Sequence, residues 1–112
     1  MDRGNPLFHV SDLNFEEEVI KSPKPILVDF WATWCSPCEA LGPLVEEIAK
    51  AYGERIKVAY LSVDENPHIT AAYSIKNIPT LILFKGGKIL EQIVGAVPKT
   101  RLVSIIEKAL LG

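Results

Sequence analysis

The chain has 112 residues, 48% of them hydrophobic and 23% charged, with a formal net charge of -2. This length suffices for one globular domain with its own core, and we expect residues 1–112 to form a single domain. The slight acidity excludes the basic surface that nucleic-acid binding requires. No run reaches the roughly 18 apolar residues of a membrane span, so no membrane partner is expected.

The start of the chain carries an acidic residue at Asp2 and is not followed by an apolar stretch of signal-peptide length. We therefore expect a cytoplasmic protein. Stable disulfides are uncommon in that compartment, where a pair of closely spaced cysteines is more often catalytic or metal-binding.

The first half of the chain alternates between apolar runs and helical patterns. Residues 7–10 form a short apolar segment, and Ser11 is predicted to cap a helix that continues through Lys21. The expected buried residues of this helix are Leu13, Val19 and Ile20. Residues 25–32 predict a strand buried on both faces, because their apolar residues are nearly continuous.

A second helical pattern follows from about Ser36 to Tyr52, with apolar residues at the spacing of one helix face. Residues 56–63 predict another buried strand. A long helix between two strands implies a parallel, right-handed crossover.

In the remainder of the chain, Asn66 and Pro67 are typical of a helix start, and this helix is predicted to end near Tyr73. The segments 80–85 and 88–94 flank two glycines, which predicts an antiparallel hairpin. Residues 99–111 have the spacing of an amphipathic helix. The predicted order is βαβαβαββα: an α/β fold with a mixed five-stranded sheet covered by helices on both faces.

The only two cysteines, Cys35 and Cys38, lie three positions apart at the predicted strand-to-helix junction. A purely structural disulfide between them would stabilise the chain little, because it would close a very short loop of the unfolded chain. At this spacing in a helix, their Cα atoms are roughly 5 to 6 Å apart, which a reversible disulfide tolerates. Cys35 lies at the positive end of the helix dipole, which stabilises a thiolate, so it is the better attacking group and Cys38 suits resolution.

Two residues between the cysteines are candidates for tuning their redox properties. Pro37 suits the first helical turn and removes one potential N–H donor to the sulfur. The hydroxyl of Ser36 is able to bond a sulfur or a free N–H. The sequence does not fix the sign of either effect.

One charged residue, Asp29, interrupts the apolar strand that precedes the cysteines. Burial makes an ionised carboxylate costly, so we expect a raised pKa and a role in proton exchange with Cys38, directly or through water. The alternative is a structural aspartate that bonds a backbone group.

Four segments of the sequence resemble the thioredoxin family. They are Val28-Asp29-Phe30-Trp31, Trp34-Cys35-Ser36-Pro37-Cys38, Ile78-Pro79-Thr80 and Val94-Gly95-Ala96. They occur in the family's order and span nearly the whole chain. A CxxC pair alone is weak evidence, but the combination is highly specific.

The resemblance implies a thioredoxin fold that reduces protein disulfides, with Cys35 as nucleophile, Cys38 as resolving thiol and Asp29 as the proton-transfer group. It implies that Pro79 is a cis-proline beside the cysteines. The residues that would border the substrate groove are Trp34, Ile78, Gly95 and Ala96. A flavoprotein or ferredoxin-linked reductase would recharge the protein, which would act as a monomer without a bound cofactor.

Three positions depart from the family pattern. Ser36 stands where glycine is usual, Glu39 where a basic residue is frequent, and Tyr60 where many members have a lysine near the buried aspartate. The charge of Glu39, four residues from Cys35, should disfavour the thiolate. Tyr60 puts the proton route of Asp29 in question.

Three other functions compete with this interpretation. Two thiolates are half of a metal site, but His9 and His68 show no ligand spacing beside them, so no metal is expected. The second is an oxidase or isomerase of the same fold. Such a protein needs a stable Cys35 thiolate and hence an easily reduced disulfide, and the charge of Glu39 disfavours that thiolate. The third is a redox-independent binding subunit or chaperone.

Overall fold

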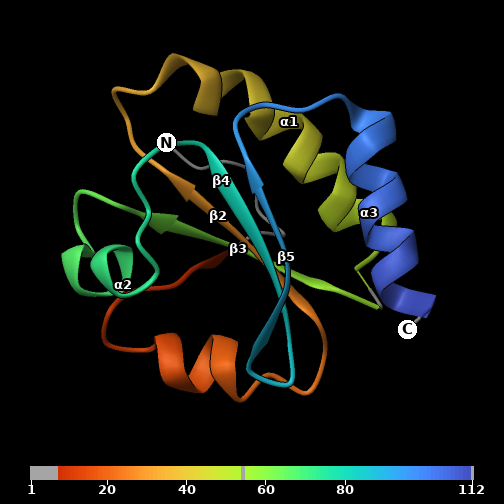
Figure 1. Ribbon diagram of the computed structural model, residues 1–112, viewed down its shortest axis with the longest axis horizontal. Helices are drawn as coiled ribbons and strands as arrows, with labels where there is room; N and C mark the ends of the chain where they lie inside the picture. The colour runs from red at the N-terminus through yellow and green to blue at the C-terminus, as the bar shows by residue number, and fades with distance from the viewer. Residues whose placement is uncertain (1–7, 54, 112) are drawn as a thin grey trace.

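The computed structural model describes residues 8–53 and 55–111, which are arranged around one five-stranded sheet (Figure 1). The strands are β1 (Phe8–His9), β2 (Ile26–Trp31), β3 (Lys57–Ser62), β4 (Thr80–Lys85) and β5 (Lys88–Val94). Their order across the sheet is β1-β3-β2-β4-β5. The pairs β1–β3 and β2–β3 are parallel, and β2–β4 and β4–β5 are antiparallel, so the sheet is mixed, as predicted.

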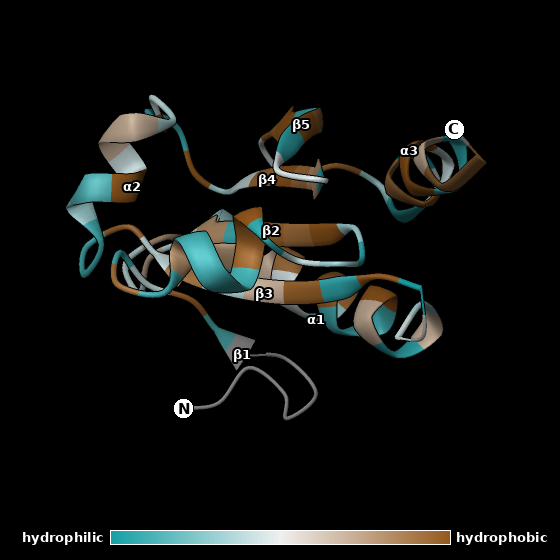
Figure 2. Ribbon diagram, turned by 90° about the horizontal axis from the view of Figure 1, so that it is seen from below, coloured by the Kyte–Doolittle hydropathy of each residue, from teal (hydrophilic) through white to brown (hydrophobic). Residues whose placement is uncertain are grey.

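The helices cover both faces of this sheet. They are η1 (Glu16–Ile20), α1 (Ser36–Ala51), α2 (Pro67–Ala72) and α3 (Lys99–Leu111). Seen along the sheet, α1 and α3 lie on one side and α2 on the other (Figure 2). One apolar cluster joins Leu27 and Leu81 of the sheet to Leu41 of α1 and Leu102 of α3. A second cluster, on the opposite face, includes Val28 with Val19 of η1 and Ile69 of α2.

The central strand β2 is buried on both faces, as its continuous apolar sequence predicted. In this strand Asp29 lies opposite Tyr60 of β3 and Leu81 of β4. Residues opposite one another share a face of the sheet, so Asp29 faces the layer of α1 and α3.

The second half of the chain follows the prediction closely. The hairpin of β4 and β5 turns at Gly86 and Gly87, whose φ angles are +60° and +81°. A turn of this kind favours glycine because side chains rarely adopt positive φ. Helix α3 spans the predicted residues.

The prediction for the first helix is wrong in its extent. Only residues 16–20 form η1, which is π-helical, and Leu13 is 97% exposed. The reason is a turn over residues 11–14, in which the Ser11 N–H donates to Oδ1 of Asn14 at 2.7 Å. Phe15 takes the buried position instead, while Val19 is buried and Ile20 partly buried, as expected. Leu7, predicted to begin the first strand, lies outside the described residues.

Candidate active site

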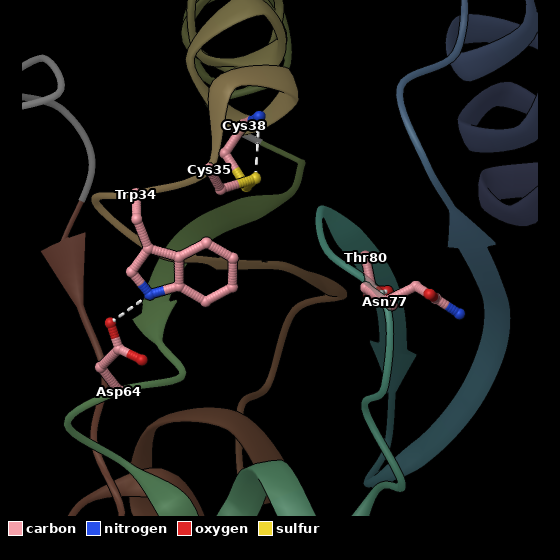
Figure 3. Close-up of a disulfide and its surroundings, with 6 residues drawn as sticks. All are labelled: Trp34, Cys35, Cys38, Asp64, Asn77 and Thr80. Atoms are coloured by element: carbon pink, nitrogen blue, oxygen red, sulfur yellow. Dashed lines mark hydrogen bonds between the residues drawn. A yellow bond between two sulfur atoms is a disulfide. The ribbon is translucent and has the colours of Figure 1, made fainter.

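Cys35 and Cys38 form a disulfide at the start of α1 (Figure 3). Their Cα atoms are 5.3 Å apart, within the range expected from their spacing. Cys35 is the residue immediately before α1, and Cys38 lies in its first turn. Both are largely buried, Cys35 at 4% exposure and Cys38 at 1%. The slightly more exposed of the two cysteines is thus the residue at the helix terminus.

The backbone at this terminus is directed at the first sulfur. The N–H of Cys38 donates to Sγ of Cys35 at 3.2 Å and to its carbonyl oxygen at 3.1 Å. Ser36 and Pro37 are exposed, and the Ser36 hydroxyl makes no hydrogen bond to the residues that the structure describes. The side chain of Glu39 is also exposed, one residue beyond Cys38.

A loop before β4 approaches the cysteines from across the sheet. The Ile78–Pro79 peptide bond is cis, Pro79 is buried, and Ile78 packs against the cluster that contains both cysteines. The N–H of Gly95 donates to the carbonyl oxygen of Pro79 at 2.8 Å, and Gly95 has a φ of +89°. The exposed Ala96 follows it.

A hydrogen bond that the sequence analysis did not identify fixes the turn before Pro79. The hydroxyl of Thr80 donates to the carbonyl oxygen of Asn77 at 2.5 Å. Figure 3 shows these two residues on the opposite side of the disulfide from Trp34.

The indole of Trp34 is 67% exposed beside the disulfide, and its Nε1 donates to Oδ2 of Asp64 at 2.8 Å (Figure 3). Asp64 is a functional candidate that the sequence analysis missed. It follows β3 at the same end of the sheet at which β2 leads to the cysteines. A polar residue just beyond the carboxyl end of a neighbouring parallel strand is the signal that would have indicated it.

Asp29 is 1% exposed in the middle of β2, and Tyr60, which lies opposite, is fully buried. Trp31, two residues further along the same face, packs against the cysteine cluster, with its ring 6.5 Å from that of Tyr60. The face that holds Asp29 therefore continues to the disulfide. Tyr60, which stands where many family members have a lysine, thus lies directly opposite Asp29.

A pocket of about 420 Å³ opens beside the second cysteine. Its lining includes Trp31, Thr33, Cys38 and Glu39. It is larger than the roughly 30 Å³ that one water molecule occupies in the liquid, so water can enter beside Cys38.

The structure contains no group of three His, Cys, Asp or Glu side chains that could hold a metal ion, as far as the described residues extend. His9 and His68 are exposed. None of the helices in residues 8–53 and 55–111 is long and apolar enough to cross a membrane.

The sequence model of one family, described as Thioredoxin, matches residues 6–108. Relatives of about 50% identity align over most of this chain. The thioredoxin of Synechocystis sp. is 52% identical over 101 residues, which are 90% of this chain and 94% of that protein.

Two further relatives come from different sources. The thioredoxin of Acidithiobacillus ferridurans is 48% identical over 107 residues, covering 96% of this chain and 99% of the relative. An M-type chloroplastic thioredoxin of Chlamydomonas reinhardtii is 48% identical over 101 residues, covering 90% of this chain and 72% of that protein.

Proposed function

The chain belongs to the thioredoxin family and is a protein-disulfide oxidoreductase that works by thiol–disulfide exchange, and we propose which of its residues carries out each step of that reaction. It acts on disulfide-containing proteins and is reduced by a thioredoxin reductase, and so contributes to redox homeostasis. The observation that carries the proposal is the Cys35–Cys38 disulfide at the start of α1, with Ile78 of the cis Ile78–Pro79 bond packed against the cluster that contains it.

Cys35 is the attacking thiol. Its thiolate attacks one sulfur of the substrate disulfide and forms a mixed disulfide, and the other substrate sulfur leaves and takes up a proton. Two features support this assignment: the N–H of Cys38 is directed at Sγ of Cys35, and the sulfur lies at the positive end of the α1 dipole.

Cys38 is the resolving thiol, and Asp29 takes its proton. The Cys38 thiolate attacks Sγ of Cys35, the second substrate thiolate leaves, and the Cys35–Cys38 disulfide forms. In total, two electrons pass from the protein dithiol to the substrate. The burial of Asp29, the continuity of its face with the cysteine cluster and the pocket beside Cys38 support a proton path through water.

The substrate groove is formed by Trp34 on one side of the disulfide and by Ile78, Pro79, Gly95 and Ala96 on the other. Trp34 is exposed, and Ile78 packs against the cysteines. The backbone at Ile78 adds the substrate peptide as a short strand, so recognition is broad in sequence. Ser36, Pro37 and Glu39 adjust the stability of the thiolate.

The protein is further proposed to be a cytoplasmic monomer with a single domain. The reactive pair lies within one chain, which holds no other cysteine, as expected in a reducing compartment. The family match over residues 6–108 supports a single domain. The recharging enzyme is an NADPH-dependent flavoprotein or a ferredoxin-linked reductase, and reduction assays with each type distinguish them.

The proposed function is tested by reducing a disulfide-bonded protein with the dithiol form of the chain. We expect stoichiometric oxidation of the chain and release of substrate thiols, and no reaction from the variant with serine at both Cys35 and Cys38. Reduction that persists in that variant would contradict the proposal, as would inactivity of a folded wild-type dithiol.

A further inference from the structure

The turn at residues 11–14 is bonded to the segment between β3 and α2, more than 50 residues away in sequence. The Asp12 N–H donates to Oδ1 of Asn66 at 2.8 Å. In return, the Asp12 carboxylate accepts from the N–H of Ile69 at 2.8 Å and from that of His68 at 3.1 Å. Asp12 thus makes one hydrogen bond to the residue before α2 and two to the first turn of α2.

Asp12 performs the capping task that the sequence assigned to Asn66. Asn66 is the residue before α2, as predicted, but its side chain does not cap the helix. Its Nδ2 donates instead to the carbonyl oxygen of Ser62 at 2.9 Å, and its side chain is nearly buried. Because Asp12 satisfies the N–H groups of the first turn, the Asn66 side chain closes the loop of residues 62–66.

Asp64 lies inside this closed loop. Its carboxylate accepts a hydrogen bond from the indole N–H of Trp34. The Trp34 side chain is too exposed to be held by packing alone. Trp34 makes no other hydrogen bond within the part of the chain that the structure describes. The orientation of the indole therefore depends on where the loop holds Asp64.

We propose that Asp12 is a positioning residue for the reductase reaction. Its carboxylate caps the first turn of α2 and leaves the Asn66 side chain to close the loop, which fixes Asp64 and holds the Trp34 indole at the edge of the substrate groove. This inference rests on the groove role proposed above for Trp34. It gives the turn at residues 11–14, which is remote in sequence from the cysteines, a part in substrate binding.

The test is the kinetics of Asp12→Ala with a disulfide-bridged peptide as substrate. We expect KM to rise about threefold to tenfold, the range implied by loss of the hydrogen bond between Trp34 and Asp64, and we expect kcat to be unchanged. The NMR signal of the Trp34 indole N–H should shift toward its position in Asp64→Ala, which has no side-chain acceptor for that N–H. Asp12→Asn should have a KM close to that of the wild type, because its amide oxygen still accepts the hydrogen bond from the Ile69 N–H.

Tyr52→Phe is the matched control. It also removes a hydrogen bond between distant segments, that of Tyr52 with Glu107, but on the α1–α3 side of the sheet. It should lower stability without changing KM or the Trp34 signal. Equal effects of Asp12→Ala and Tyr52→Phe on KM would overturn the proposal.

A double-mutant cycle with Trp34→Phe separates this inference from the proposed function. If Asp12 acts through Trp34, Asp12→Ala should not raise KM further in the Trp34→Phe background. If Trp34→Phe raises KM but Asp12→Ala leaves it unchanged, the positioning role alone is wrong. If Trp34→Phe has no effect on KM, the groove role of Trp34 fails and the inference fails with it.

Discussion

The backbone N–H of Cys38 lies 3.2 Å from Sγ of Cys35, and the sulfur of the first cysteine thereby caps the helix that carries the second. A thiolate is a stronger acceptor than a disulfide sulfur, so this contact strengthens when the disulfide is reduced. The two sulfurs are therefore unequal in position and in stabilisation.

Replacing Glu39 by lysine should lower the pKa of the Cys35 thiol. The exchange removes a negative charge near the start of α1 and adds a positive one, which favours the thiolate. The measurement is titration of thiolate absorbance in the ultraviolet. Glu47→Lys makes the same charge change at an exposed site further along α1 and should have a smaller effect. An unchanged or raised pKa in Glu39→Lys would contradict the prediction.

Replacing Asp29 by asparagine should slow resolution of the mixed disulfide by about a hundredfold at neutral pH, a typical contribution of general acid–base catalysis. Asparagine has nearly the same shape but cannot accept the proton. The measurement is the rate of substrate release from a preformed mixed disulfide. The first attack, measured in a Cys38→Ser background, should change much less. Equal slowing of both steps would argue against a specific role in resolution.

The sequence predicted the second half of the fold better than the first, for a physical reason. The hairpin of β4 and β5 is specified locally by Gly86 and Gly87. The turn at residues 11–14 is held by bonds to Asn66 and the start of α2, which lie far along the chain. A local capping pattern at Ser11 contains no information about such distant partners.

The same distinction applies to the site. The positions of Cys35, Cys38 and Asp29 follow from local pattern, because a strand leads directly into a helix there. Asp64 is brought to Trp34 only by the parallel pairing of β2 with β3. Its contact is a tertiary one that no local pattern contains.

The stability of the protein should depend on the ionisation of Tyr52. Its hydroxyl donates to the Glu107 carboxylate, and this hydrogen bond, with burial and the charge of Glu107, raises the pKa of Tyr52 above its usual value. The stabilisation is complete below the unfolded-state pKa of about 10 and is lost as the pH rises through the higher folded-state pKa.

Urea unfolding of the wild type and Tyr52→Phe checks this dependence. We expect the wild type to be more stable by about 1 kcal/mol at pH 8, and this difference to shrink above pH 10. Comparing the two proteins cancels the titration of lysines in the same range. A difference that stays constant up to pH 11 would contradict the account.

The central claim, that Cys35 attacks and Cys38 resolves, is tested most directly by trapping the intermediate. Reduced Cys38→Ser is mixed with a disulfide-bridged peptide and analysed by intact mass and peptide mapping. The account predicts a stable peptide adduct on Cys35, and at most slow adduct formation on Cys38 in Cys35→Ser. Adducts that form faster on Cys38 than on Cys35 would contradict it.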